Sequence, residues 1–243
     1  MRLGDRDEYD YYRHVHIHVN TQLNAIREHQ STQDADISPD FEEKVALKVS
    51  EVINYPLELI HVSVTCGDRM IHNGSRAPMA FVDIDTANKF SEEANPGYTV
   101  KFQEFFTKEL NIPASRTKKM PKIIIHTNIK DADIPEDFEE KVAQIISDVV
   151  GYPLEIIYVS VTCGDRMIHN GSRDPMAFVN IDTANKFNAE VNPGYTVKFQ
   201  EFFTNALKIP ASRLVLHYQA TQVWDYGVHR TAPEYKHPEY YSK

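Results

Sequence analysis

Hydrophobic positions follow two different periods along the chain, and the second half shows them most clearly. Short runs rich in β-branched residues favour strands, and they occur at residues 122–128, 156–161, 175–181 and 214–218. Apolar residues that recur every three or four positions favour amphipathic helices, and they occur at residues 133–150 and 195–207. The pattern predicts an α/β (α+β) fold of two strand–helix–strand units, with a four-stranded sheet under two helices on one face.

Residues that cap or break helices mark the limits of the first of these helices. Asp133, Pro135 and Glu136 form the pattern of a capped helix start, with an acidic cap, an early proline and a glutamate three residues after the cap. Gly151 is placed to end the helix in the left-handed conformation that glycine adopts readily.

The chain contains a close internal repeat. The stretch Asp36–Arg116 returns as Asp133–Arg213 at an offset of 97 residues, and 63 of these 81 positions are identical. One structural unit therefore occurs twice, and we call residues up to 116 the first copy and residues from 121 the second copy. Aromatic residues at helical spacing in both copies are expected to be core rather than a ligand site, namely Phe102, Phe105, Phe106, Phe199, Phe202 and Phe203.

The first copy differs from the second at both ends. Its first strand is expected at residues 14–19, and the loop behind that strand carries about 11 additional polar residues at 22–32. After Arg116 the sequence runs directly into Met120, so the first copy lacks a fourth strand. Unless another segment covers the sheet edge left by the missing strand, that edge is open for pairing.

These features divide the chain into five segments. The expected boundaries are a flexible acidic N-terminus at 1–12, a first, truncated domain at 13–116, a junction at 117–120, a complete domain at 121–225 and a tail at 226–243. The tail is rich in Tyr, His and Pro and has no periodicity, so we predict that it is flexible.

Composition and charge restrict the class of protein. Hydrophobic residues make up 42% and charged residues 25% of the 243 positions, as in soluble globular proteins, and no apolar run reaches the roughly 18 residues of a membrane span. The net charge of −9 argues against nucleic acid and anionic membranes as partners. The N-terminus lacks the apolar segment of a secretory signal, and Cys66 and Cys163 occupy the same repeat position, which argues against a disulfide framework.

Three histidines of the first copy are candidate metal ligands. His14, His16 and His18 alternate along the expected first strand and therefore project from one face, where three imidazoles can bind zinc. The matching residues of the second copy include Lys122 and Ile124, so the repeat does not preserve these ligands. We therefore predict solvated or partly packed histidines and no metal site.

Met120 and Pro121 resemble the start of a protein although they lie in the middle of the chain. In peptide linkage, the nitrogen of Pro121 is an amide without a proton or a basic lone pair. At a free N-terminus the same nitrogen is a secondary amine, and an apolar pocket lowers the pKa of such an amine because burial disfavours its charged form. A pKa near the working pH suits a general base, so Pro121 is the candidate catalytic residue.

The second copy resembles the macrophage migration inhibitory factor family in an ordered set of segments. These segments are Met-Pro before an apolar strand ending in His-Thr-Asn, a helix closing at Gly-Tyr-Pro, the strand Ile-Tyr-Val-Ser-Val, the segment Asn-Gly-Ser-Arg-Asp-Pro-Met-Ala, and Ile-Pro-Ala-Ser-Arg before the last strand. The resemblance covers Pro121 to about Gly227, and Arg13 to Arg116 in truncated form.

The resemblance implies tautomerase-fold domains that assemble into a trimer-based homo-oligomer. It also implies keto–enol tautomerisation of phenylpyruvate-like or dopachrome-like substrates, which are small aromatic keto acids or similar molecules, with the amino-terminal proline as base and without a cofactor. Members of the family also act as cytokines secreted without a signal peptide. A cell-surface receptor is therefore a further expected partner, and the expected localisation is cytoplasmic, secreted, or both.

Several pocket positions of the family carry different residues in this chain. The lysine expected after the first helix aligns with Tyr152, and the apolar residue expected after the third strand aligns with Ala184, beside Thr183. The tyrosine and asparagine of the fourth strand align with Val215 and His217. Tyrosine donates only a neutral hydrogen bond to a substrate carboxylate, about half as strong as a charged one. Tyr152, Thr183, Ala184 and His217 are thus the expected substrate-binding residues of a pocket with altered preference.

Two arginines of the second copy, Arg166 and Arg173, are alternative sources of positive charge for a substrate. In the first copy, Arg13 stands at the position of the proline, so this copy is predicted to be catalytically inert. In the second copy, Pro121 becomes a base if the chain is cleaved before it or if the natural product starts at Met120. Three hypotheses stay open: an isomerase, a cytokine-like binding protein with vestigial catalysis, and a structural tandem subunit.

Overall fold

A computed structural model describes the strands and helices of both copies. The described residues are 13–20, 37–66, 69–72, 75–76, 79–84, 91, 93–111, 121–184 and 186–221, without the side chains of 13–20, 65–66, 72, 81 and 83. The predicted polar loop at 22–32, the junction at 117–120, the missing strand after Arg116 and the tail at 226–243 lie outside these residues. So do the side chains of His14, His16, His18 and Cys66.

The second copy folds into the two predicted strand–helix–strand units. They consist of β5 (Lys122–Thr127), α3 (Phe138–Val150) and β6 (Tyr158–Thr162), followed by β7 (Ala177–Ala184), α4 (Asn192–Leu207) and β8 (Leu214–Thr221). The four strands lie in the order β6-β5-β7-β8, with β5 parallel to β6 and antiparallel to β7. The predicted fold class, a four-stranded sheet with two helices, is confirmed for this copy.

The first copy repeats this arrangement with fewer strands in its own sheet. Its elements are β1 (Arg13–Asn20), α1 (Phe41–Ile53), β2 (Ile60–Cys66), β3 (Arg69–His72), β4 (Met79–Ile84) and α2 (Asn95–Leu110). Its sheet has the order β2-β1-β4. Within the described residues, no strand pairs with the outer edge of β4, where the second copy has β8.

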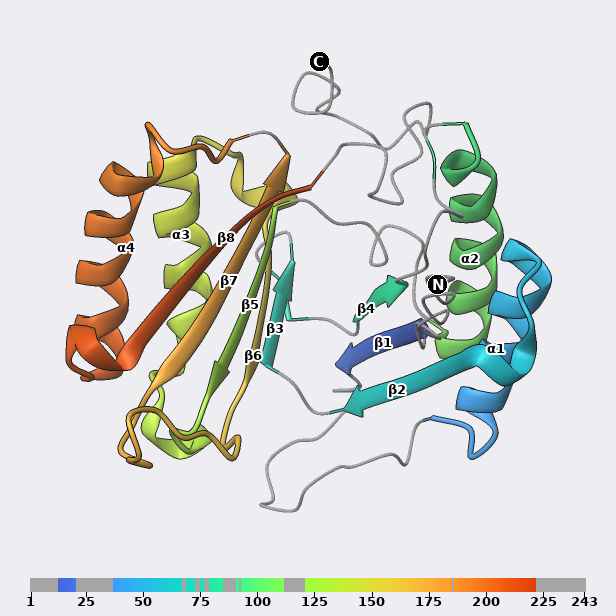
Figure 1. Ribbon diagram of the computed structural model, residues 1–243, viewed down its shortest axis with the longest axis horizontal. Helices are drawn as coiled ribbons and strands as arrows, with labels where there is room; N and C mark the ends of the chain where they lie inside the picture. The colour runs from blue at the N-terminus through green and yellow to red at the C-terminus, as the bar shows by residue number, and fades with distance from the viewer. Residues whose placement is uncertain are drawn as a thin grey trace, which may run out of the picture.

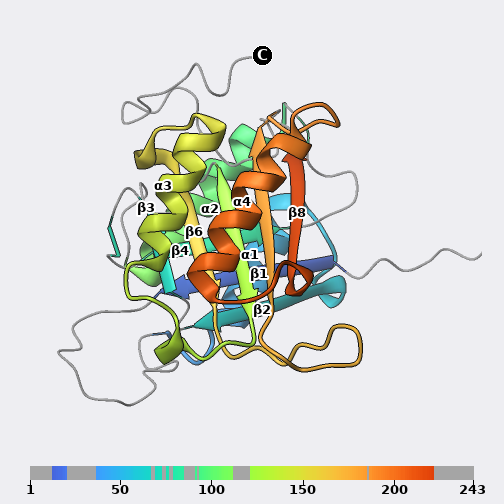
Figure 2. The ribbon, with the colours of Figure 1, turned by 90° about the vertical axis from the view of Figure 1, so that its left-hand side faces the viewer.

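The helices of the two copies lie on the outer sides of the molecule, and the two sheets lie between them (Figures 1 and 2). In the second copy, Phe138, Phe199 and Phe203 are fully buried between helices and sheet, and in the first copy Phe41 and Phe106 are. The prediction that the aromatic stripes are core is thereby confirmed for Phe106, Phe199 and Phe203. No helix in the described part of the chain has the length and apolar character needed to cross a membrane.

The expected limits of several elements were wrong. Asp133 was predicted to cap α3, but Asp131–Asp133 form a separate 3-10 turn and the helix begins at Phe138. The reason is that Ile134 has an extended backbone and a buried side chain, which anchors the chain before the helix can start. Strand β7 also runs further than expected and includes Thr183 and Ala184, which were placed after it.

The two copies are joined by a strand that leaves its own sheet. β3 of the first copy pairs antiparallel with β6, from Arg69 opposite Val161 to His72 opposite Tyr158, and becomes the edge of a five-stranded sheet of the second copy. We call this contact, together with the side chains around it, the joint. Ile71 is buried in the core of the second copy, and Met70 packs against Tyr158.

A charged cluster lies beside the paired strands of the joint. The carboxylate of Glu139, at the start of α3, is fully buried and forms ion pairs with both Arg69 and Arg76. Arg76 also binds Glu140 with two hydrogen bonds, 2.9 Å from Nε to Oε1 and 2.7 Å from Nη2 to Oε2. Arg69 additionally donates to the carbonyl of Pro135 at 2.8 Å. Because both charges of a buried pair must be matched, these contacts fix the position of β3 on α3.

The joint should weaken in acid through Glu140. Burial alone raises the pKa of this carboxyl, but the hydrogen bond and charge of Arg76 outweigh burial, so the pKa lies below its ordinary value of 4.5. A lowered carboxyl pKa stabilises the fold above the ordinary pKa, and this contribution is lost as the pH falls through the lowered one. We expect urea denaturation to show a stability difference between wild type and Glu140→Gln at pH 7 that shrinks below pH 4. An unchanged difference would contradict the role of Glu140.

Candidate functional site

Pro121 lies at one end of the second sheet, in its interior. The residue is buried, and its carbonyl accepts a hydrogen bond from the backbone N–H of Tyr158 at 2.9 Å. Extending the strand register by one residue places Pro121 between Ile157 and Thr183. The predicted base therefore lies directly before the first residue of a central strand, β5, at the edge of the hydrophobic core.

Tyr152 reaches the same end of the sheet from α3. Gly151 ends that helix in the left-handed conformation, at φ 85°, and returns the chain toward the sheet. The Ser147 hydroxyl donates to the carbonyl of Tyr152 at 2.7 Å and holds the turn. The phenol of Tyr152 is buried and donates to the carbonyl of Ala184 at 3.2 Å. Tyr152 and Ala184, predicted from separate parts of the sequence, are thus in direct contact.

Thr183 adds a polar group to this end of the sheet. Its side chain is fully buried, and its hydroxyl oxygen has no hydrogen-bond partner among the described residues. Buried hydroxyls without a partner are uncommon, because leaving one unpaired costs about 1–3 kcal/mol. A hydroxyl in that state beside the expected base is suited to hydrogen-bond a ligand.

Lys186 is a cation near the site that the sequence reasoning missed. Its ammonium lies over the ring of Tyr152, 5.4 Å from the ring centroid, an arrangement that an aromatic face stabilises. Lys186 stands two residues after Ala184, so the turn behind β7 carries it to the same end of the sheet. A signal was available: the pentapeptide Thr-Ala-Asn-Lys-Phe is identical in both copies.

The remaining predicted residues lie elsewhere. His217 is exposed on β8, where its Nδ1 is 3.1 Å from Asn180 Oδ1. Its strand partner is three residues from Thr183, or about 10 Å at ~3.3 Å per residue. Arg166 and Arg173 follow β6 and precede β7, at the opposite end of β5, about 20 Å from Pro121. Neither arginine can therefore replace the missing lysine within this copy.

Two histidines of the second copy lie away from Pro121. His126 Nδ1 is 2.8 Å from Asp165 Oδ2. His169 forms a turn with Ser172 through two backbone hydrogen bonds of 3.0 Å. Within the described residues, no three His, Cys, Asp or Glu side chains gather as metal ligands would. Within the described residues, the predicted site residues lie together only near Pro121.

The arrangement has the parts of a small proton-transfer site. Thr183 lies opposite Pro121 in the extended register, Tyr152 contacts the next residue, Ala184, and Lys186 supplies positive charge next to Tyr152. With Pro121 in peptide linkage, its nitrogen is an amide and cannot act as a base. With Pro121 as a free N-terminus, a secondary amine would stand in a largely apolar setting, next to a hydroxyl donor and a cation.

Known proteins match both copies of the chain in sequence. The family model described as Macrophage migration inhibitory factor (MIF) matches residues 26–118 and 120–232. The MIF-like protein mif-2 of Caenorhabditis elegans is 29% identical over 97 residues, covering 40% of this chain and 81% of the relative. D-dopachrome decarboxylase-B of Xenopus laevis is 28% identical over 113 residues, covering 46% and 96%. Macrophage migration inhibitory factor of Mus musculus is 27% identical over 99 residues, covering 41% and 86%.

Solved structures of the same family also match. The macrophage migration inhibitory factor of Trichinella spiralis has a TM-score of 0.41 at 23% identity, covering 42% of this chain and 89% of that one. The protein of Oncomelania hupensis has a TM-score of 0.41 at 21% identity, covering 43% and 75%. Each sequence relative corresponds to one copy, and the family model matches both copies. The chain therefore belongs to the macrophage migration inhibitory factor family, as a tandem duplicate.

Proposed function

We propose that the second copy is a keto–enol tautomerase for phenylpyruvate-type substrates, small aromatic keto acids, and that it is active when Pro121 is an N-terminal residue. The observation that carries this proposal is the burial of Pro121 at the end of β5, next to Thr183 and near the contact between Tyr152 and Ala184. The first copy has Arg13 in place of the proline and is proposed to be catalytically silent.

The chemistry follows from the groups around Pro121. The neutral amine takes the proton of the enol hydroxyl, and the resulting ammonium returns a proton to the adjacent carbon, which leaves the keto form and regenerates the amine. Lys186 pairs with the substrate carboxylate, and the Thr183 hydroxyl donates to the substrate oxygen that gains charge. Burial favours the neutral amine, which is the form that acts as base.

Exposing the nitrogen of Pro121 tests the proposal directly. We expect two co-expressed chains, residues 1–119 and 120–243, to form active protein, because methionine aminopeptidase removes an initiator methionine that precedes proline. The cut falls outside the described residues, and the joint holds the halves together. The rate of enol–keto conversion, followed by ultraviolet absorbance, should exceed that of the uncut chain at least about 100-fold, as expected for a positioned general base.

A matched control keeps the cut and blocks the amine. In this control the second chain begins with an added methionine before Lys119, and the large lysine side chain prevents removal of that methionine. Pro121 then stays an amide, and activity should remain at the level of the uncut chain. If intact mass confirms Pro121 as the N-terminus and turnover still equals buffer, the tautomerase proposal is wrong.

Lys186 should affect substrate binding more than the chemical step. We expect Lys186→Gln in the two-chain protein to raise KM for phenylpyruvate about 10-fold, because a charged hydrogen bond contributes about 1.5–3 kcal/mol. The value of kcat should change less than about twofold. Lys198→Gln, on the outer surface of α4, is the control. An unchanged KM would assign the carboxylate to another cation.

A binding function without catalysis is the second candidate. Two observations favour it: the peptide linkage of Pro121 and the tyrosine at the position of the expected lysine. In this case the intact chain acts on a cell-surface receptor, as a protein that is cytoplasmic, secreted, or both. Receptor binding by the uncut chain, unchanged in a Pro121→Gly variant, would support this function, and lack of binding to cells would remove it.

A further inference from the structure

A buried ion pair lies directly beside the proposed base. The Nζ atom of Lys122, the residue after Pro121, is 3.8 Å from Oδ2 of Asp182. Both residues are buried, and they stand opposite each other in the antiparallel register of β5 and β7. Charged side chains are rarely buried unless they are paired, and the proton transfer proposed above uses neither of these two.

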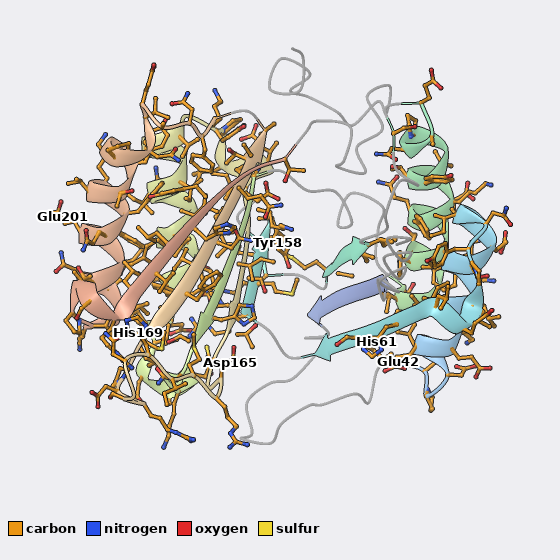
Figure 3. All side chains as sticks on the ribbon, viewed as in Figure 1. Glu42, His61, Tyr158, Asp165, His169 and Glu201 are labelled. Carbon is orange, nitrogen blue, oxygen red and sulfur yellow. The ribbon has the colours of Figure 1, made fainter. Side chains whose placement is uncertain are left out.

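The pair lies on the face of the second sheet that is turned away from its helices. Ile123 and Ile125 belong to the core under α3 and α4, and successive residues of a strand point to opposite faces. Lys122 therefore points to the other face. Tyr158, in register with Lys122 on β6, lies on the side of the sheet that faces the first copy (Figure 3), where it packs in one cluster with Met79 of β4. The first copy thus covers this face next to the ion pair.

A carboxylate at the position of Asp182 acts against the proposed base. Thr183 lies opposite Pro121 in the extended register, so Asp182 is one residue away from that position. Spacings of ~3.3 Å per residue and ~4.8 Å between strands place the Cα atoms of Pro121 and Asp182 roughly 6 Å apart. A negative charge about 4–6 Å from an amine favours its protonated form and raises its pKa by about 1–3. Without compensation, Asp182 would hold the amine in the form that cannot accept a proton.

Lys122 carries the charge that compensates this carboxylate. Of the two residues in register with Asp182, Gln219 is neutral and Lys122 is a cation. The tyrosines near Pro121 are phenols, which carry no charge near neutral pH. The other ionisable residues on the elements around Pro121 are Tyr152, Glu155, which is exposed, Tyr158 and Lys186, which lies over the ring of Tyr152, with His72 in register with Tyr158 on β3.

The sequence repeat separates the acid from the lysine. Asp182 recurs in the first copy as Asp85. The positions of Pro121 and Lys122 are instead taken by Arg13 and His14. The acid is therefore present in both copies, whereas the lysine occurs only in the copy that has a proline in the place of the base.

We propose that Lys122 is a positioning residue that keeps the amine of Pro121 neutral by compensating the charge of Asp182. In this role Lys122 contacts neither the substrate nor the reacting atoms. It acts through its ion pair with Asp182, which cancels most of the attraction between the carboxylate and a protonated amine. The inference rests on the proposed function, because it concerns Pro121 as a free N-terminus, but the protonation of Pro121 can be measured without a substrate.

Titration of Pro121 in the two-chain protein tests the role of Lys122 directly. In protein labelled with nitrogen-15 proline, the amine nitrogen of Pro121 has a chemical shift distinct from those of the proline amides, and this shift follows its protonation as the pH changes. Lys122→Met should raise the pKa of Pro121 by about 1 or more, because the uncompensated carboxylate stabilises the ammonium form. Asp182→Asn should lower the pKa of Pro121, because the charge of Lys122 is then uncompensated.

A double variant, Lys122→Met with Asp182→Asn, separates charge compensation from loss of structure. It removes both charges, so the pKa of Pro121 should return close to that of the wild type, and neutral replacement of a buried ion pair often has little effect on stability. Lys198→Met, at an exposed position of α4, is the matched control and should leave the pKa of Pro121 unchanged. An unchanged pKa in Lys122→Met, or a raised pKa that persists in the double variant, would overturn the proposal.

The pH dependence of turnover gives a second measurement. Below the pKa of the amine, a rise of 1 in that pKa lowers the neutral fraction about tenfold. The kcat/KM of Lys122→Met should therefore fall by about this factor at acid pH and recover above both pKa values. The predicted titration without turnover would reject the tautomerase and uphold the role of Lys122. Turnover with an unchanged pKa of Pro121 would uphold the tautomerase and reject the role of Lys122.

Discussion

Glu139→Gln should destabilise the folded protein by about 3 kcal/mol, as measured by urea or thermal denaturation. The substitution keeps the shape of the side chain and removes a fully buried charge that faces Arg69 and Arg76. Breaking a buried ion pair by removing one partner typically costs about 3–5 kcal/mol, since the remaining charge stays without compensation. We expect the lower end of this range because both arginines are partly exposed and Arg69 keeps the carbonyl of Pro135.

The repeat supplies a matched control for this substitution. Glu42 occupies the same place on α1, is exposed, and has no ion pair recorded within the described residues. Glu42→Gln in the same chain, studied at concentrations where it is monomeric, should therefore leave the denaturation midpoint unchanged. If both substitutions lowered the stability by a similar amount, the decrease would come from helix propensity or the helix dipole and not from the joint.

The repeat also shows where sequence prediction of this fold reaches its limit. Alternation and helical periodicity predicted the four strands and two helices of the second copy, because these elements are specified by one-sided burial. The Arg-Met-Ile-His segment is not among the strands predicted for either copy, yet it is strand β3 in the first copy and lies outside any strand in the second. Identical local sequences have identical propensities, so only the tertiary partner β6 explains the difference.

The candidate site shows a similar division. Tyr152, Thr183 and Ala184 were assigned by alignment with the family, and they lie close to Pro121 because the ends of α3, β5 and β7 meet at one end of the sheet. His217 was assigned in the same way but lies away from them on β8. Alignment gives the strand on which a residue lies, and it does not say which sites that strand reaches within one chain.

Phe203→Ala should lower the free energy of unfolding by about 3–5 kcal/mol, the usual decrease when a large aromatic side chain is removed from a core. Phe203 is fully buried on α4, with its ring centroid 6.3 Å from that of Phe138 and 5.0 Å from that of Phe202. Val197→Ala, at an exposed position of the same helix, should leave the unfolding free energy within about 0.5 kcal/mol of wild type. Denaturation in urea, followed by far-ultraviolet circular dichroism, measures both.

The equivalent substitution in the first copy, Phe106→Ala, tests whether the copies unfold together. Phe106 is buried against Phe41 and Phe102. The substitution Phe106→Ala should therefore lower the free energy of unfolding by about as much as Phe203→Ala does. When the first copy unfolds, it withdraws β3, removes Ile71 from the second core and exposes Tyr158 and the Glu139 carboxylate. The second copy then loses an edge strand, the buried side chain of Ile71 and the ion pairs of Glu139, so its own stability falls. We therefore expect both substitutions to shift one shared transition, whereas two separate transitions that respond independently would show that the joint does not couple the copies.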